Sequence, residues 1–445
     1  MRKLGLGLLS AAFLFTGGTA WATNGHQLAA VGAYGAGMGG AVTAAPFDAT
    51  TAVTNPAGLT KIGARADYDF GLFMPKRSVD FTGTGGSTTN GGSEQYLLPA
   101  VGWSAPVNDE QTLFFGGGMF IVSGMGVDYD TINVMPFQAG LGNNSVFKGR
   151  IYSQYQLWKM APALAKKFTD NFSVGLALNV DYQQLSLKQW FYDPASQSAT
   201  TGNYDRQFGV DLSTPAGVMG YGFTVGALYD INDVVSIGVN YASQQNFGKM
   251  QYRLKARDVM YSPDNATMYI SKDGTYTLGM NFPAQYAVGV AIHPMSSLTI
   301  TADYKVIKFA DTMKTLTLEG DYNTASATTG APIGTATAMN MNMGWKDVTV
   351  IAVGVQYQLG DMGFIRAGYN AGGSPIDNTN ASSNWAFPAV AKNHYMLGGT
   401  ANIGTHWQLS LAYENISKET VTGAYGDKIS LEGTSYVLGV TYLFR

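Results

Sequence analysis

Cysteine is absent from the 445 residues, and charged residues are scarce at 13 %. The absence of cysteine excludes a disulfide scaffold, a zinc–thiolate site and a cysteine nucleophile. The charged fraction is about half of the roughly 25 % typical of soluble domains. With a formal net charge of −3, this composition excludes a basic nucleic-acid binder and a charged disordered chain.

Long apolar runs are also missing. Beyond the first 22 residues no stretch reaches the ~18 apolar residues of a membrane-spanning helix, and no run shows helical periodicity. A helical membrane protein is therefore excluded. The chain is instead rich in glycine (56 residues) and tyrosine (26 residues), and 46 % of it is hydrophobic. This combination favours a β-rich protein whose surroundings are not water alone.

The first 22 residues have the pattern of an export signal. Met1-Arg2-Lys3 is basic, an apolar run extends from Leu4 to Phe15, and Ala20-Trp21-Ala22 is an A-x-A cleavage site. We expect residues 1–22 to be a signal peptide, so that the mature chain begins at Thr23. The protein is then exported.

Alternation of apolar and small or polar residues dominates the rest of the chain. After Asn171, for example, Phe172, Val174, Leu176 and Leu178 alternate with serine, glycine and alanine. Period two places every second side chain on one face of a β-strand. Two packed sheets of a soluble protein would also show alternating apolar and polar residues. Three further features are therefore needed to distinguish such a protein from other β-sheet proteins.

Those features are strand length, aromatic placement and loop length. The segments are longer than the usual 5–6 residues, aromatic residues gather near their ends, and short turns alternate with long loops. This pattern predicts an antiparallel transmembrane β-barrel, an all-β fold that must close because lipid leaves no open edge. The fourteen expected strands are 64–75, 95–107, 110–122, 153–168, 171–187, 218–231, 234–247, 282–294, 297–310, 346–359, 362–373, 391–403, 406–417 and 431–445.

Residues 23–63 precede the barrel, expected at 64–445, and do not alternate. Their glycine-rich part lacks the flanking strand and helix of a dinucleotide-binding fingerprint. A fourteen-stranded barrel encloses more space than its own side chains fill. Because the segment carries many apolar residues, a hatch that plugs the lumen is favoured over a solvated periplasmic tail.

The hatch residues carry a resemblance to a known family. Gly25-His26-Gln27-Leu28 and above all Asn55-Pro56-Ala57 resemble the start of the FadL/TodX family of outer-membrane transporters of long-chain fatty acids and other hydrophobic compounds. The resemblance implies a monomeric barrel of fourteen strands plugged by the hatch. It further implies substrate capture on extracellular loops, binding in the lumen and sideways release at a kinked third strand. The hatch residues singled out are Gly39, Gly40, Asn55, Pro56 and Ala57.

Two sets of residues are candidates for the transport path. Gly116, Gly117 and Gly118 in the third strand weaken that strand and match the family's lateral gate, although a glycine-rich strand also explains them. The third and fourth long loops are unusually apolar, which favours a capture groove over loops that merely pack together. The groove candidates are Trp190, Phe191, Phe208, Met260, Tyr261, Met268 and Ile270.

Lys305 and Arg366 are candidate partners for a fatty-acid carboxylate inside the barrel. Ion pairs that tie the plug to the wall explain such charges as well. The four histidines are scattered, without the spacing of metal ligands. We expect no metal and no cofactor.

Three other functions compete with fatty-acid transport. A general diffusion porin would have an open polar lumen and no need of an apolar N-terminal segment. A channel for aromatic or aliphatic hydrocarbons would share the apolar path but need no headgroup partner. An enzyme is not expected, because no nucleophile-elbow motif is present. The expected partners are a hydrophobic small molecule and outer-membrane lipids of a Gram-negative bacterium, with no nucleic acid.

Overall fold

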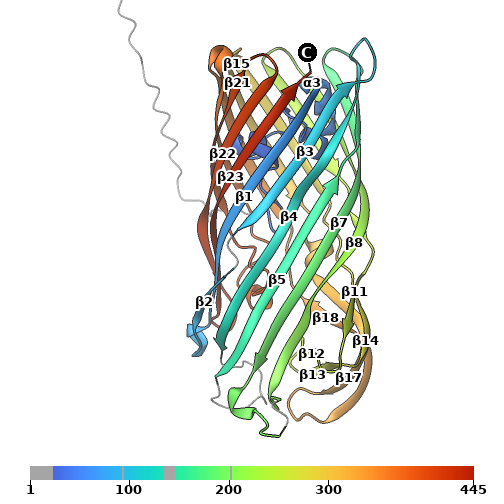
Figure 1. Cartoon of the computed structure of the whole chain (residues 1–445), viewed down its shortest axis with the longest axis vertical. Coiled ribbons are helices and arrows are strands. Elements are labelled where there is room, and N and C mark those ends of the chain that lie inside the picture. Colours follow the sequence, from blue (N-terminus) through green and yellow to red (C-terminus); the bar gives the residue numbers. More distant parts are fainter. Residues whose placement is uncertain (1–23, 93–94, 135–145, 201–202, 445) are drawn as a thin grey trace, which may run out of the picture.

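A computed structural model of the chain describes residues 24–92, 95–134, 146–200 and 203–444. Within these ranges the strands form one antiparallel sheet, which closes because β1 (Arg65–Asp80) pairs with β23 (Lys428–Leu443) along its whole length. The expected barrel is confirmed, with fourteen strand positions in the described part of the chain (Figure 1). The expected signal peptide 1–22 and the start at Thr23 lie outside the described residues.

Most of the fourteen positions are single strands. The fourth consists of β5 (Phe147–Met160) and β6 (Ala163–Lys167), which are separated by Ala161 and Pro162. The others are β3 (Tyr96–Pro106), β4 (Leu113–Val134), β7 (Phe172–Tyr192), β8 (Gln207–Asp230), β9 (Val235–Ala242), β15 (Gln285–Met295), β16 (Leu298–Ile307), β19 (Val348–Gln358), β20 (Gly363–Gly372), β21 (Asn393–Ile403) and β22 (Trp407–Thr422).

Short turns join the strands at one end and long excursions join them at the other (Figure 1). The short turns lie where turn-forming residues predict them. In the first, the Asn108 side chain accepts the N–H groups of Thr112 and Leu113 at 3.0 and 2.8 Å. The chain's C-terminal end lies on this short-turn side.

Several strands extend further into the long loops than expected. β4 was expected to end at 122 but continues to Val134, and β7 continues to Tyr192. The hydrophobic phase inverts in these extensions. On β7 the apolar residues Leu176 and Leu178 face outward, 47 % and 59 % exposed, whereas Leu185 is 1 % exposed and faces inward. The wall is therefore apolar outside near the short turns and apolar inside near the long loops.

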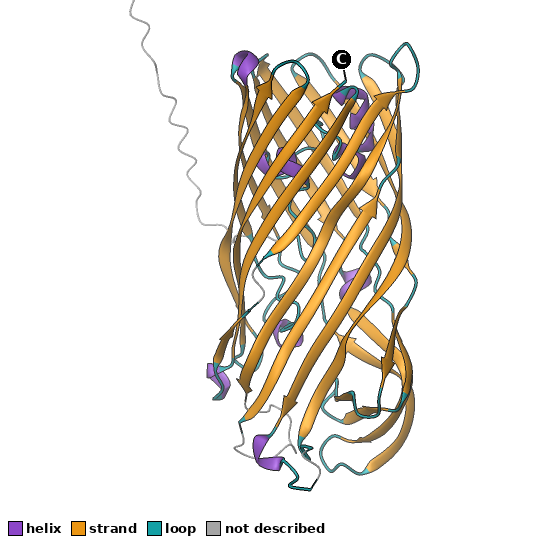
Figure 2. Ribbon diagram, viewed as in Figure 1, coloured by secondary structure: helices purple, strands orange, loops and turns teal. Residues whose placement is uncertain are grey.

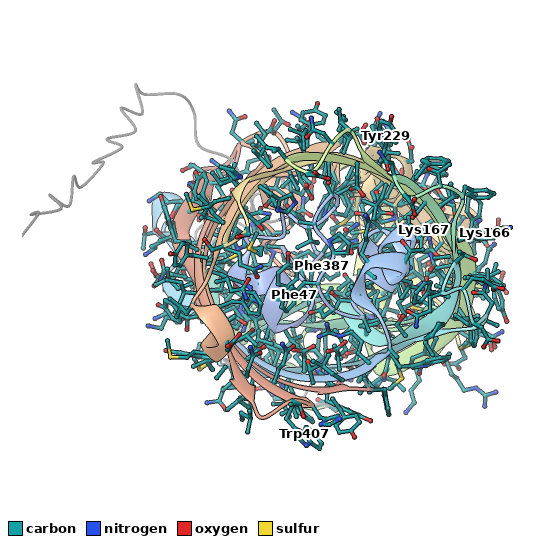
Figure 3. The ribbon with its side chains drawn as sticks, turned by 90° about the horizontal axis from the view of Figure 1, so that it is seen from above. Phe47, Lys166, Lys167, Tyr229, Phe387 and Trp407 are labelled. Atoms are coloured by element: carbon teal, nitrogen blue, oxygen red, sulfur yellow. The ribbon has the colours of Figure 1, made fainter. Side chains whose placement is uncertain are left out.

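The hatch lies inside the barrel near the short-turn end, as Figure 3 shows from above. It contains α1 (Gly32–Gly37), α2 (Thr51–Thr54), the 3₁₀ turn η1 (Pro56–Gly58) and α3 (Leu59–Ile62). Most of its residues are buried. None of the described helices is long and apolar enough to cross a membrane.

The long-loop end adds further strands and an inward fold. Residues 374–390, expected as a long loop, run into the lumen, where Trp385 and Phe387 are buried (Figures 2 and 3). The added elements are β2 (Thr88–Asn90), β10 (Asn246–Phe247), β11 (Met250–Leu254), β12 (Val259–Tyr261), β13 (Thr267–Ser271), β14 (Gly274–Leu278), β17 (Thr315–Ser326), β18 (Pro332–Asn342), α4 (Ala310–Met313) and the 3₁₀ turns η2 (Thr82–Thr84), η3 (Pro194–Ser196), η4 (Gly360–Met362) and η5 (Ala381–Ser383).

Candidate functional site

The wall is interrupted between its second and third strands. β3 and β4 pair from Pro106↔Phe114 to Ala100↔Phe120, and no pair between them follows in the described residues. β3 nevertheless continues to Tyr96 along β1. We call the opening between Tyr96–Pro99 of β3 and Ile121–Gly126 of β4 the slit.

The start of the hatch takes the place that β3 leaves free along β4. Leu28 donates its N–H to the carbonyl of Val122, and Gly124 donates its N–H to the carbonyl of His26, both at 3.1 Å. β4 has a bulge at this point, between Ile121 and Ser123. A bulge bends a strand, so the hatch and the slit share one irregular stretch of β4.

A cavity of about 140 Å³ lies between the slit and the hatch. Its wall is mostly apolar, and its charged residues within the described chain are Arg77 and Glu414. An engineered apolar cavity of about 150 Å³ binds benzene, so this space suits a small hydrophobic molecule or part of a longer one. The apolar side chains of the lining include Val31, Phe73, Leu97, Leu98, Ile121 and Val437.

A second cavity of about 60 Å³ lies across hatch residues 27–31 from the first and is more polar. Lys159 and Lys305 both line it. The Lys159 ammonium is bound to Asp181 at 3.1 Å. No ion pair within 4.0 Å joins Lys305 to another described residue, and the charge of Asp303 acts on its ammonium from further away.

His26, near the start of the hatch, occupies a cage of aromatic rings. Its ring centroid is 4.9 Å from that of Phe309 and 5.6 Å from that of Trp345, with Tyr155 and Phe282 completing the cage. Nδ1 is 2.7 Å from the Ser123 hydroxyl, while Nε2 has no hydrogen-bond partner among the described residues. Burial lowers the pKa of His26 to about 3. The ring is therefore neutral at neutral pH.

Buried carboxylates of the wall hold the hatch backbone. Asp303 accepts the N–H groups of Val42 and Thr43, and Asp69 accepts the N–H of Ala33. These bonds satisfy amides that would otherwise be buried without partners. Within the hatch, burial raises the pKa of Asp48 to about 6, and the nearby charge of Asp67 acts in the same direction.

The predicted hatch residues form close contacts with the wall. Gly39 and Gly40 have positive φ, and Asn370 donates its side-chain amide to the Gly39 carbonyl at 2.9 Å. Asn55 donates to the carbonyls of Thr43 and Ala227 at 2.8 and 3.1 Å. Pro56 and Ala57 lie against Gly175, where a Cβ atom would approach the Ala57 nitrogen to 2.3 Å.

Arg366 lies against the hatch rather than beside an open cavity. Its guanidinium is 4.9 and 4.8 Å from the ring centroids of Tyr34 and Phe47, and it donates to Gln356 and Thr400. Of the two candidate carboxylate partners, only Lys305 lines either of the two cavities described above.

The three glycines of the predicted gate lie beside the slit, not at it. Gly116, Gly117 and Gly118 all pair with β3. Gly117 has φ +144°, and a Cβ there would come within 2.5 Å of the Ala161 carbonyl, at the break between β5 and β6. Their role as a gate stays a prediction.

The predicted groove residues gather in one loop-end assembly. β12 pairs with both β8 and β13, which places Met260 opposite Ile270. Phe191 is fully buried and stacks on Phe208 at 5.2 Å. Tyr261 packs on the same large apolar cluster, whereas Trp190 and Met268 are not among its members. The side chains pack together, and a capture role for them stays a prediction.

Comparison with known proteins identifies the family. The model of the outer membrane protein transport protein family (OMPP1/FadL/TodX) matches residues 14–442. The chain belongs to this family. Family members are outer-membrane transporters of hydrophobic compounds, and this function follows for the chain.

Solved members of the family share the fold at low sequence identity. The toluene transporter TodX of Pseudomonas putida is 16 % identical, with a TM-score of 0.68 over 94 % of this chain and 99 % of TodX. A FadL homologue of Pseudomonas aeruginosa is 17 % identical, with a TM-score of 0.67 over 95 % and 100 %. A protein of Neisseria meningitidis serogroup B named as an outer membrane protein is 22 % identical over 91 % of each chain.

The family resemblance implied an opening at the third strand, but sequence reasoning placed its candidates at Gly116–Gly118 and missed the residues that border the slit. Pro75 and Pro99 are a local signal of it, because proline has no N–H to donate and is confined to strand edges and bulges. Pro75 lies where β1 has no ladder partner on the slit side, and Pro99 borders the slit on β3. His26 stands out only as part of the family resemblance of Gly25–Leu28, and Arg77 has no signal in the sequence. In the described residues no group of three or more His, Asp or Glu side chains could hold a metal.

Proposed function

We propose that the protein captures hydrophobic molecules at the loop end, passes them through the lumen and releases them sideways through the slit. The observation that carries this route is that the slit borders the apolar cavity, while the hatch occupies the lumen beyond it. Release through the wall keeps an apolar molecule out of water.

Entry is proposed at the loop end of the apolar cluster. This cluster continues from Phe191 and Val259 through Phe309 and Trp345 to Tyr155, which lines the cavity at the slit. A hydrophobic molecule that displaces side chains along this cluster stays in apolar surroundings throughout. A general porin would need a water-filled lumen instead, and the buried hatch and cluster argue against one.

The substrate class is proposed as small hydrocarbons and hydrophobic acids. The size and apolar lining of the cavity suit a single aromatic ring or a short aliphatic segment. A protein of similar structure, CymD, is a monoaromatic hydrocarbon channel. Lys305, whose ammonium is free of ion pairs in the second cavity, is the proposed partner for a fatty-acid carboxylate.

The remaining expectations follow the same proposal. The chain works as a monomer in the outer membrane, surrounded by its lipids, after removal of a signal peptide at residues 1–22. It is a transporter without enzymatic activity. The ring of outward apolar residues, such as Phe70, Leu178 and Leu411 at 58–59 % exposure, supports lipid as its surroundings.

Filling the slit tests the sideways route. Gly124 is exposed and lines the cavity, and a Cβ there would meet only the Tyr155 carbonyl, at 3.4 Å. Gly124→Trp is expected to abolish the protein-dependent part of octan-1-ol uptake into proteoliposomes, measured against protein-free liposomes, and the matched Gly274→Trp, at a position with nothing within 4 Å, is expected to leave it unchanged. Wild-type rates in Gly124→Trp would overturn the sideways route.

Removing the hatch tests closure of the lumen. Deletion of residues 23–60 is expected to open a water-filled channel and let sugars into proteoliposomes, from which the intact protein excludes them. Sugar entry through the intact protein at the rate of an open channel would instead support a porin. Unchanged conductance after the deletion would contradict the role of the hatch.

A further inference from the structure

Two polar side chains lie next to each other in the mostly apolar wall of the cavity beside the slit. Glu414 of β22 and Ser435 of β23 are directly paired in the sheet, and both line this cavity. Residues opposite each other in an antiparallel pair point to the same face, with their Cβ atoms about 5 Å apart. Ala412 and Ile416, two positions to either side of Glu414, are buried. This face of β22 is therefore the lumen face.

The carboxylate of Glu414 is held through one of its two oxygens. Nδ1 of His394 lies 2.5 Å from Oε1, and His394 Nε2 is buried without a hydrogen-bond partner among the described residues. In the neutral ring a proton on Nδ1 fits this environment, because a proton on Nε2 would have no acceptor. His394 thus positions the carboxylate, while Oε2 has no partner in the described part of the chain.

The hydroxyl of Ser435 completes the polar pair. Ser435 is 3 % exposed, and no hydrogen bond joins its hydroxyl to another described residue. A hydroxyl both donates and accepts, whereas a carboxylate oxygen only accepts. The hydroxyl of a ligand can therefore donate to Oε2 of Glu414 and accept from Oγ of Ser435. In apolar surroundings such bonds matter, because a polar group without a partner is unfavourable there.

The other charged residue of the described lining has no N–H group to offer a ligand. Nη1 of Arg77 donates to the Gly126 carbonyl and, at 3.1 Å, to the Tyr96 hydroxyl, and its Nε and Nη2 are buried. The Glu414 carboxylate is therefore the charged group that can reach a ligand in this cavity. It accepts a hydrogen bond from a hydroxyl and repels the carboxylate of an acid.

One row of paired residues connects the polar pair with the slit. Ser435 pairs with Phe73 of β1, and Phe73 pairs with Tyr96 at the start of β3. Both aromatic residues line the same cavity, and their ring centroids are 6.4 Å apart. A molecule held at Glu414 by its hydroxyl would extend its apolar part over Phe73 toward the slit.

We propose that Oε2 of Glu414 and Oγ of Ser435 bind the hydroxyl group of a neutral hydrophobic molecule, a phenol or an alcohol, whose apolar part occupies the cavity beside the slit. The volume of about 140 Å³ suits one aromatic ring. This site rests on the proposed function and narrows its substrate class, because it assigns hydroxylated compounds to this cavity. The second cavity, with Lys159 and Lys305 in its lining, is left to acids.

Ligands that differ at one group test the proposal. p-Cresol, p-xylene and 4-methylbenzoate share a methyl-substituted ring and carry a hydroxyl, a methyl and a carboxylate group opposite the methyl. Binding to the full-length protein in lipid nanodiscs is measured at pH 7 by equilibrium partitioning, with empty nanodiscs subtracted. The variants are Ser435→Ala, Glu414→Gln and Glu414→Leu. The controls are Ser430→Ala and Glu419→Gln, on the same two strands but outside the lining of both cavities.

The expected result is selective loss of p-cresol binding. The wild type binds p-cresol more tightly than p-xylene. Glu414→Leu weakens p-cresol binding about tenfold or more, because a hydrogen bond to a charged group is lost, and Ser435→Ala weakens it about threefold. Neither variant weakens p-xylene binding. Glu414→Gln keeps a neutral acceptor, so it gives an intermediate p-cresol affinity and tighter binding of 4-methylbenzoate.

Three outcomes would overturn the hydroxyl site: equal wild-type affinities for p-cresol and p-xylene, equal effects of the variants on both ligands, or the same effects in the controls. Each of them leaves the sideways route to be decided by Gly124→Trp. If Gly124→Trp keeps wild-type uptake of octan-1-ol while Glu414→Leu loses p-cresol alone, the site stands and the route fails. Should Glu414→Leu not fold, Ser435→Ala and Glu414→Gln decide the question.

Discussion

The carboxylate of Asp303 on β16 accepts the backbone N–H of Thr43 in the hatch at 2.9 Å. The same oxygen accepts the N–H of Val42 at 3.0 Å. A wall residue and a hatch residue 260 positions apart in sequence are thereby joined. Attachment of this kind holds the hatch at a fixed position along the barrel axis. Four predictions follow from this attachment and from the two cavities beside the hatch.

Loss of the Asp303 carboxylate should loosen the hatch. Asp303→Ala leaves two buried N–H groups without acceptors, at a cost of about 1–3 kcal/mol each. The expected result is more frequent small-ion leak events in planar-bilayer recordings. Asp361→Ala, at an exposed turn position, is the control. A wild-type leak in Asp303→Ala would contradict the attachment.

Substitution of a wall glycine should displace Asn55. A Cβ at Gly226 would lie 2.0 Å from the Asn55 side-chain oxygen, so Gly226→Ala forces the hatch away from β8. We expect a destabilisation of roughly 1–3 kcal/mol, measured by thermal unfolding in detergent. Gly274→Ala adds a methyl group where nothing lies within 4 Å. The two variants should therefore differ, and equal unfolding midpoints would count against the contact.

Acid should release the start of the hatch. Burial holds the pKa of His26 at about 3 in the folded state, below its ordinary 6.5. The unfolded segment therefore binds more protons than the folded one between these two values, and stability is full above pH 6.5 and falls as the pH drops toward 3. The loss is about 3 kcal/mol near pH 4.

Hydrogen exchange of the amides of residues 24–30 measures this release. Exchange should accelerate between pH 7 and pH 4 once the intrinsic pH dependence is removed. His26→Gln should abolish the extra acceleration, whereas His406→Gln, at the short-turn end, should retain it. An acceleration of equal size in His26→Gln would assign the effect to other groups.

Loss of the Lys305 ammonium should favour neutral cargo. Lys305→Met removes one of the two lysine ammonium groups that line the second cavity, so octanoate transport into proteoliposomes is expected to fall by up to about tenfold relative to octan-1-ol. Lys308→Met breaks the ion pair with Asp347 at an exposed site and serves as the control. An unchanged ratio of the two rates would remove Lys305 from the acid path.

The barrel could be predicted from sequence because each strand carries its own evidence. Alternation in Phe172–Leu178 requires no knowledge of the neighbouring strand. Strand ends were missed for a physical reason. Beyond the lipid the wall faces water outside and packed side chains inside, so Leu185 and Leu187 are apolar on the face opposite to Leu178. Period two continues there with its phase reversed, and such segments look like irregular loops.

The site was less predictable because its parts meet only after folding. The slit depends on where β3 stops pairing with β4 and on the hatch residues that take over. Pro75 and Pro99 mark strand edges there, but no short segment shows which hatch residues pair with β4. Asn55 could be singled out by resemblance. Arg77 could not, since an arginine in a loop-side strand is ordinary until the cavity that it lines is known.

The reversal of the apolar face also shows how far along the barrel the lipid extends. On β4 the last outward apolar residue before the bulge is Met119, and Asp128 and Asp130 follow on the outer face. The slit lies between Met119 and Asp128 along β4, where the outer face of the wall changes from apolar to polar. On the proposed route, cargo leaving there would enter the membrane close to its surface on the long-loop side, in the outer leaflet. A separate crossing to the inner leaflet would still lie ahead of it, so on the proposed route the barrel would perform only the first half of the passage.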